Sequence, residues 1–164
     1  MPSSIDPQDT LFFIAGGLNG KELETATTIE NLTKIVHQLH TAGGRHFFIA
    51  LMPTAIPGFA EVGLRLNPAL EQLPIKIRAE LDPVDIRSRW GKYFDTILAD
   101  PKKYEITNTT DACAGREIFD QDPSPRGDPA TYFYYHSNHP TTTVHRYVAD
   151  GLISKFNALI PAGE

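Results

Sequence analysis

The segment from residue 10 to residue 53, TLFFIAGGLNGKELETATTIENLTKIVHQLHTAGGRHFFIALMP, decides the fold. Its two ends, residues 10–17 and 46–53, are short apolar runs typical of strands that are buried on both faces. Between them, apolar residues recur at helical spacing from residue 21 to residue 42, and a pair of glycines ends that helix. Strand, helix and strand in this order predict a βαβ unit with parallel strands.

The rest of the chain predicts further helices, a strand and a long loop. Residues 69–81 have helical spacing that Pro74 interrupts, and residues 101–131 are rich in proline, aspartate and threonine, which predicts a long loop. Because no repeat or boundary is visible, we expect a single α/β domain over residues 1–164. The remaining expected elements are a short third strand at residues 83–86, a helix at 89–100, and a last helix from Thr141 or Thr142 to about Leu159.

The composition excludes several function classes. The 164 residues carry a formal net charge of −5, whereas nucleic-acid binding needs a basic face, so we expect no nucleic-acid partner. No apolar run is long enough for a membrane span, and the N-terminal residues lack the pattern of a signal peptide. The single cysteine, Cys113, allows no internal disulfide, which fits a reducing compartment. These features predict a cytoplasmic protein.

The segment GGLNG, residues 16–20, directly follows the first expected strand. Ligands of parallel α/β sheets bind at the carboxyl ends of the strands, so Gly16, Gly17 and Leu18 are candidate substrate-binding residues. Glycines allow the chain to turn tightly beside a ligand, and the Asn19 amide is a hydrogen-bond donor. The alternative is a turn that joins a strand to a helix and binds nothing.

Three histidines, His136, His139 and His145, surround the expected start of the last helix. Pro140 suits the first helical turn, which would place His139 at the positive end of the helix dipole. This position disfavours the imidazolium and favours a neutral base. The alternative is a histidine without chemical role in the loop before the helix.

A metal site is not expected, and neither is a cofactor. The spacing His-x2-His-x5-His matches no zinc pattern, and the nearby sequence lacks a cysteine or a clear acidic ligand. Cys113 is a candidate nucleophile if a histidine lies beside it, but most lone cysteines are small residues of a core or loop.

Four segments in this order resemble the SGNH or GDSL-type hydrolases, in the branch of the lipase-like esterases. FFIAGGLNG, residues 12–20, is similar to the family's apolar strand followed by Gly-x-Asn-Asp, and YFYYHSNHPTTTVHRYVADGLI, residues 132–153, resembles its final block Asp-x-x-His-Pro-Thr. Residues 39–53 and 84–113 are similar to the stretches between these blocks. The resemblance implies a three-layer α/β/α sandwich with a parallel sheet, in a truncated, flavodoxin-like form.

The same resemblance implies roles for individual residues. Asn19 takes the place of the oxyanion-hole donor and His139 that of the catalytic base, while His136 stands where the family has its Asp. No counterpart of the Gly-Asp-Ser nucleophile block precedes the first strand, so we do not expect this chain alone to hydrolyse esters. We expect instead a small carbonyl- or ester-containing ligand and non-hydrolytic acid/base chemistry by these three residues, with Tyr135 among the residues that line the site.

Two alternatives stay open. The chain is the C-terminal part of an SGNH ester hydrolase that needs a second chain for its serine, or it is a non-catalytic scaffold. In the family, the missing block supplies the strand beside residues 10–15, so truncation leaves an apolar strand edge. We therefore expect this edge to be covered by a second copy, as a homodimer, or by a separate partner chain.

Overall fold

The computed structural model describes residues 6–20, 22–81, 85–88 and 90–157. The chain divides into two compact units. The first comprises Met1–Thr54 with Phe59–Lys92, and the second comprises Ala55–Gly58 with Tyr93–Glu164. The organisation as one domain over residues 1–164 stays a prediction.

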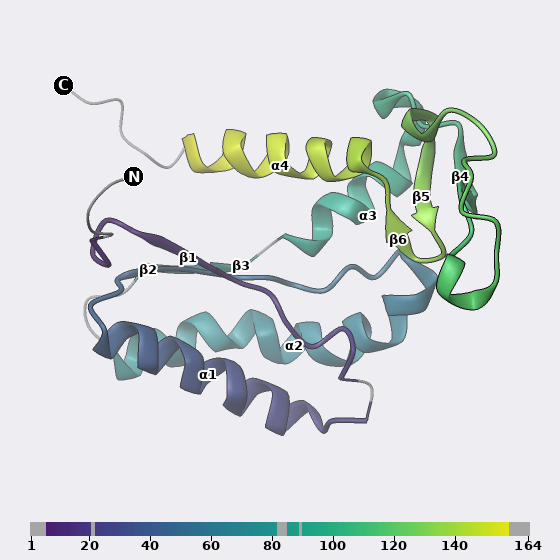
Figure 1. Cartoon of the computed structure of the whole chain (residues 1–164). Coiled ribbons are helices and arrows are strands. Elements are labelled where there is room, and N and C mark those ends of the chain that lie inside the picture. Colours follow the sequence, from purple (N-terminus) through teal and green to yellow (C-terminus); the bar gives the residue numbers. More distant parts are fainter. Residues whose placement is uncertain (1–5, 21, 82–84, 89, 158–164) are drawn as a thin grey trace. The chain divides into compact units, whose positions relative to one another are not determined.

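The first unit is a parallel sheet with two helices on one face (Figure 1). The helix α1 leads from β1 to β2, and α2 leads from β2 to β3. Right-handed crossovers that step in one direction along a sheet place their helices on the same face. The predicted βαβ unit is therefore confirmed. The sheet has the order β1-β2-β3, and its elements are β1 (Leu11–Ile14), α1 (Thr25–Thr41), β2 (His46–Ile49), α2 (Pro57–Glu80) and β3 (Asp85–Ser88).

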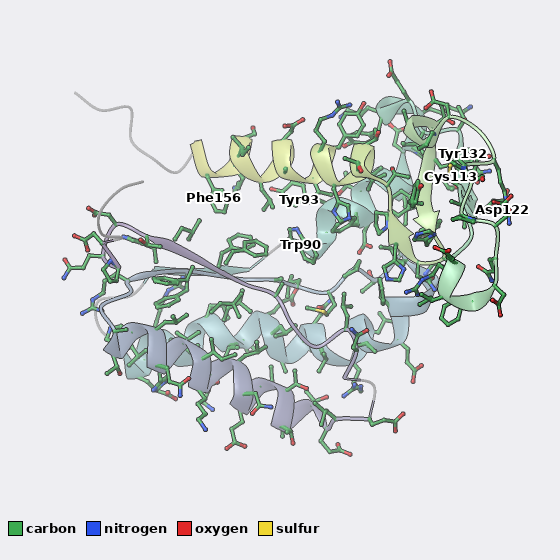
Figure 2. The ribbon with its side chains drawn as sticks, viewed as in Figure 1. Trp90, Tyr93, Cys113, Asp122, Tyr132 and Phe156 are labelled. Carbon is green, nitrogen blue, oxygen red and sulfur yellow. The ribbon has the colours of Figure 1, made fainter. Side chains whose placement is uncertain are left out.

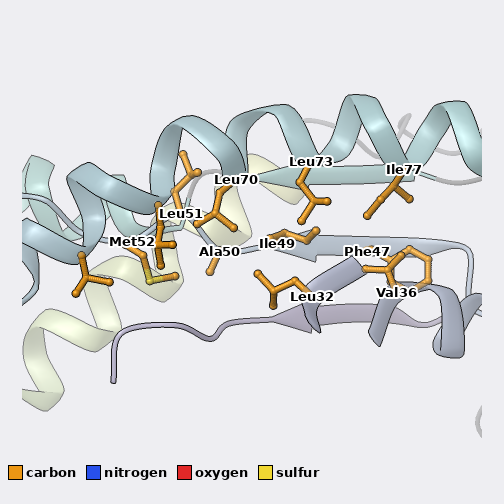
Figure 3. Packing of buried hydrophobic residues seen from close by; sticks show 12 residues of the cluster. Leu32, Val36, Phe47, Ile49, Ala50, Leu51, Met52, Leu70, Leu73 and Ile77 are labelled. Carbon is orange, nitrogen blue, oxygen red and sulfur yellow. The ribbon is translucent and has the colours of Figure 1, made fainter. Parts of the chain in front are cut away.

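The core of this unit lies between the sheet and its two helices. Phe47 and Ile49 of β2 point toward the helices and are each about 1% exposed. Figure 3 shows them among the side chains of α1, of α2 and of the residues that follow β2. The labelled partners are Leu32, Val36, Ala50, Leu51, Met52, Leu70, Leu73 and Ile77.

The first strand differs from the prediction, because it is not buried on both faces. Phe12 and Ile14 pack against the core, whereas Leu11 and Phe13 are 45% and 43% exposed. Successive side chains of a strand point to opposite faces, and the helices of this unit cover only one of them. In the described part of the chain, β1 is an end strand that pairs with β2 alone.

The helix α2 also differs from the prediction, because Pro74 does not interrupt it. It runs from Pro57 to Glu80 through both Pro68 and Pro74. A proline inside a helix removes a backbone hydrogen bond, but this helix buries a continuous apolar face that outweighs the loss. The buried residues of that face include Val62, Leu66, Leu70, Leu73 and Ile77.

The second unit contains a small mixed sheet and two helices. Its strand β4 is parallel to β5, and β5 forms an antiparallel hairpin with β6. The prediction of a long loop at residues 101–131 is therefore wrong in part, because the backbone between Thr107 and Ala114 pairs with β5 and its approach. The elements are α3 (Gly91–Ala99, in this unit from Tyr93), η1 (Pro101–Tyr104), β4 (Asn108–Ala112), η2 (Glu117–Phe119), η3 (Pro129–Thr131), β5 (Tyr132–His136), β6 (His139–Pro140) and α4 (Thr142–Asn157).

The mixed α/β class with a parallel sheet is thus confirmed, while the third layer of the predicted sandwich stays a prediction. The third strand lies at Asp85–Ser88; residues 83 and 84 of the predicted strand lie outside the described residues. Among the described residues, no helix combines the length and the apolar character needed to cross a membrane.

The side chain of Asn67 ties α2 to the chain that leaves β2. Its Oδ1 accepts a hydrogen bond from Met52 N at 2.8 Å, and its Nδ2 donates to Met52 O at 2.9 Å. We predict that Asn67→Ala lowers the free energy of unfolding by about 2–4 kcal/mol, because two backbone groups beside the core lose their partner.

Urea denaturation measures this loss. The control is Glu71→Gln, which breaks the exposed 3.3 Å ion pair between Glu71 and Lys92. Its cost is at most about 1 kcal/mol. If Asn67→Ala costs no more than this control, the two hydrogen bonds do not anchor α2.

Candidate functional site

A pocket of about 490 Å³ opens at the carboxyl end of the first sheet. Four of the predicted site residues, Gly16, Gly17, Leu18 and Asn19, line it together. We call it the loop pocket. Its other lining residues come from the ends of all three strands and from the start of the loop before α1: Ala15, Gly20, Leu23, Met52 and Trp90.

The loop that follows β1 has a conformation that only one residue type adopts without strain. Gly17 has φ 110°, and a Cβ there would lie 3.1 Å from Leu66 Cδ1. The chain then turns twice, with Gly20 N donating to Gly17 O at 3.0 Å and Leu23 N to Gly20 O at 3.1 Å. Asn19 lies at the exposed tip, and its amide has no hydrogen-bond partner in the described part of the chain.

Arg65 of α2 holds this loop by hydrogen bonds. Its guanidinium donates to Leu23 O at 2.8 Å, to Gly20 O at 3.3 Å and to Thr25 Oγ1 at 3.3 Å. Sequence reasoning missed Arg65, because it lies more than 40 residues from the loop. It mostly contacts backbone carbonyls, which carry no side-chain signal.

The apolar side of the loop pocket was also missed. Met52 follows β2 and Trp90 follows β3, so each reaches the pocket from the carboxyl end of its strand. Trp90, labelled in Figure 2, packs edge to face on Phe13 with ring centroids 5.9 Å apart. Both residues resemble ordinary core side chains in the sequence, and only the strand order brings them to the Gly-rich loop.

The second group of predicted residues lies on the hairpin β5–β6, residues 132–140, which we call the histidine hairpin. His136 ends β5 and His139 begins β6, and the two are direct cross-strand partners. Side chains of such partners lie on the same face of a sheet. A two-residue turn, Ser137 and Asn138, connects them, with Asn138 at φ 61°.

Both histidine rings lie against backbone carbonyls. His139 Nδ1 is 2.8 Å from Ser137 O, and His136 Nδ1 is 3.2 Å from Ala114 O. A carbonyl oxygen can only accept, so each Nδ1 donates its proton, and in the neutral ring Nε2 keeps its lone pair. His139 is exposed, whereas His136 is half-buried and packs edge to face on Tyr135. In the neutral form of each ring, these contacts therefore favour the tautomer with the proton on Nδ1.

The expected place of Pro140 in the first helical turn is wrong. Pro140 pairs with Tyr134 in the hairpin, and α4 begins only at Thr142. The predicted cap is present, since Val144 N donates to Thr141 Oγ1 at 3.4 Å. His139 thus lies before the helix, and because a helix dipole acts mainly within the first turn, the carbonyl contact is the stronger control on its ring.

The two remaining candidate residues, His145 and Cys113, make contacts within the second unit. His145 of α4 packs edge to face on Phe94 with centroids 5.7 Å apart, and partial desolvation lowers the pKa of its imidazole. Cys113 follows β4 in the second unit (Figure 2) and is fully buried, with Sγ 3.9 Å from Gly127 O. The buried Cys113 thiol is therefore not accessible to a substrate.

The predicted site residues thus form two groups. The loop pocket belongs to the first unit, and the histidine hairpin with Tyr135 belongs to the second. In the described ranges, no three side chains of His, Cys, Asp or Glu gather in a way that could hold a metal ion.

Comparison with protein-family models gives no match, and comparison with the curated proteins gives none either. The resemblance to SGNH-type hydrolases therefore rests on the motifs themselves.

Gly16 and Gly17 form a matched pair for testing the loop. We predict that Gly17→Ala destabilises the protein by about 1–3 kcal/mol, since alanine is strained at a φ of 110° and its methyl crowds Leu66. In Gly16→Ala, the nearest atom to the new methyl is Leu32 Cδ2 at 4.0 Å, so stability changes by about 0.5 kcal/mol or less. Thermal and urea unfolding compare the two, and equal effects would show that the left-handed turn is not required.

Proposed function

We propose that this chain is an SGNH-type hydrolase relative that binds a small carbonyl- or ester-containing molecule and performs non-hydrolytic acid/base chemistry on it. His139 is the base, Asn19 is the donor to the carbonyl oxygen, and His136 is a second proton-transfer group. The observation that carries the proposal is the 2.8 Å contact from His139 Nδ1 to Ser137 O, because it leaves Nε2 as the basic nitrogen.

The contact at Nδ1 supplies what an orienting carboxylate supplies in serine hydrolases. There, an acceptor behind the imidazole selects the tautomer and aims Nε2 at the reacting group. In this chain His136 stands at the carboxylate's place in the motif, and the carbonyl of Ser137 accepts the hydrogen bond from His139 Nδ1 instead. Orientation of the base is thereby retained without an acidic residue.

The loop pocket supports the other half of the proposal. Asn19 offers an amide donor beside the backbone of three glycines, and Met52 and Trp90 make the pocket partly apolar. A hydrogen bond to a developing oxyanion is stronger where apolar groups exclude water. The pocket therefore suits a carbonyl group attached to an apolar body.

The chemistry needs no nucleophile from the protein. In the proposed mechanism, His139 Nε2 removes a proton from the carbon next to the carbonyl, and the electron pair moves to the carbonyl oxygen, which a hydrogen-bond donor stabilises. Return of the proton to another carbon gives isomerisation, and departure of a β-substituent gives elimination. For His136 to supply the returning proton, it starts as the imidazolium and donates from Nε2 while His139 keeps the proton that it removed. Attack by a nucleophile elsewhere in the same substrate gives cyclisation.

As further parts of this proposal, we place the protein in the cytoplasm, since a lone buried cysteine suits a reducing compartment. We also infer that the sheet of the first unit is one layer of a three-layer α/β/α sandwich.

Proton abstraction can be followed before the natural substrate is known. We predict that the protein catalyses deuterium exchange at the α-carbon of some of a panel of uncharged ketones and esters in D₂O, measured by proton NMR. His139→Ala lowers the exchange rate about 100-fold or more, because a positioned base contributes this much. Asn19→Asp, which removes the donor and keeps the shape, lowers it by a similar factor.

The control for this experiment is His145→Ala, whose ring packs on Phe94 and has no role in the proposal. It leaves exchange unchanged. Exchange that survives in His139→Ala at the rate of the unmodified protein would remove His139 from the mechanism.

One observation favours a second candidate function, that of an ester hydrolase completed by a serine from another chain. In the described part of the sheet, β1 is an end strand of apolar residues that pairs with β2 alone. An apolar strand edge of this kind pairs readily with a further strand. A second copy of the chain or a serine-bearing strand would cover it.

We predict that, if this second function is right, adding a polypeptide with an apolar strand followed by Gly-Asp-Ser produces ester hydrolysis that neither chain has alone. A fluorophosphonate probe would then label the added serine only in the mixture. Phe13→Lys abolishes the gain, whereas Leu64→Lys, at a residue that is 69% exposed on α2, does not. Absence of any gain, with a monomer in light scattering, would rule this candidate out.

A further inference from the structure

The turn between the two histidines makes a contact that the proposed function does not use. Asn138 Oδ1 accepts a hydrogen bond from Gly58 N, the second residue of α2, at 3.1 Å. The approach is so close that a Cβ on Gly58 would lie 2.5 Å from Asn138 Cγ. Residues 55–58 and the histidine hairpin belong to the same unit, so this contact is internal to it.

The partner of Asn138 is itself held in place. Ala55 N donates to Asp95 Oδ1 of α3 at 2.8 Å, and Ile56 is only 1% exposed. The segment 55–58 is therefore fixed at one end by α3 and in its middle by burial. Asn138 consequently binds the turn to a fixed point of the unit rather than to a free end.

This contact bears directly on the base. The carbonyl that His139 Nδ1 donates to belongs to Ser137, and the peptide bond that contains it joins Ser137 to Asn138. The orientation of that carbonyl depends on the backbone of Asn138, which is left-handed at φ 61°. A side chain that holds Asn138 therefore holds the hydrogen-bond acceptor of His139.

We propose that Asn138 is a positioning residue that keeps the Ser137 carbonyl behind His139 and so keeps Nε2 as the basic nitrogen. The catalytic meaning of this inference rests on the proposed function. The state of the imidazole, however, can be measured without any substrate.

The residue type fits this role for two reasons. Asn and Asp tolerate left-handed backbone better than other residues with a side chain. Each also carries an oxygen that can accept from the N-terminal N–H groups of a helix. Glycine has the first property and lacks the second, so Asn138→Gly and Asn138→Asp separate the backbone requirement from the hydrogen bond.

The experiment is side-chain nitrogen NMR of the complete chain, which reports the tautomer of each histidine. We expect His139 to be mainly in the Nδ1–H form. In Asn138→Gly the ratio of Nδ1–H to Nε2–H falls about fivefold, as expected when one hydrogen bond no longer holds the carbonyl. Asn138→Asp keeps the ratio, and Gly58→Ala, whose methyl displaces the Asn138 amide, lowers it as Asn138→Gly does.

The control is Ser137→Ala, because its side chain is exposed and the carbonyl in question is retained. Amide spectra confirm that each variant is folded, and Gly58→Ala provides the test if Asn138→Gly is not. An unchanged tautomer ratio in folded Asn138→Gly, or an equal fall in Asn138→Asp, overturns the inference. A changed ratio with unchanged α-proton exchange supports the role of Asn138 and contradicts the proposed function.

Discussion

The structure of the first unit depends on the complete burial of the chain from Phe47 to Met52. Each of these side chains is at most 4% exposed, and the strand within this segment pairs with a parallel neighbour on both sides. Two backbone hydrogen bonds hold the residues that follow this strand. Ala50 N donates to Ile14 O at 2.9 Å, and Gly91 N donates to Leu51 O at 3.0 Å. Because this segment fixes the ends of all three strands, it also fixes where the loop pocket forms.

Features set by local sequence could be predicted, and features set by distant partners could not. The βαβ unit follows from periodicity and glycine stops, and Thr141 as a cap follows from its residue type. The continuity of α2 through Pro74 depends on a buried face, and β4 depends on a strand more than 20 residues later. The role of Arg65 could not be predicted for the same reason, because it consists of contacts with the distant loop between β1 and α1.

The segment around His139 has a different local structure from the one that its residue types predict. Pro140 is typical of a helix start, yet two strand partners, Tyr134 and His136, hold the residues around it in a hairpin. The control on His139 consequently shifts from the helix dipole, a long-range field, to a single carbonyl at 2.8 Å. A contact of this kind is sensitive to small changes in the turn, which is why Asn138 matters.

In the proposed mechanism, a backbone carbonyl behind His139 does less than the carboxylate of a serine hydrolase does. A carboxylate both orients the imidazole and stabilises the imidazolium by its charge, whereas a carbonyl orients the ring and contributes only a dipole. Hydrolysis through an acyl intermediate requires the imidazolium to persist until the leaving group departs. Isomerisation returns the proton to the same substrate, whereas elimination passes it to the departing β-substituent. In the proposed mechanism His136, the cross-strand partner of His139, lies on the same face of the hairpin to take part in either transfer. Under the proposed function, a second histidine in place of the acid therefore fits proton transfer better than it fits support of a serine.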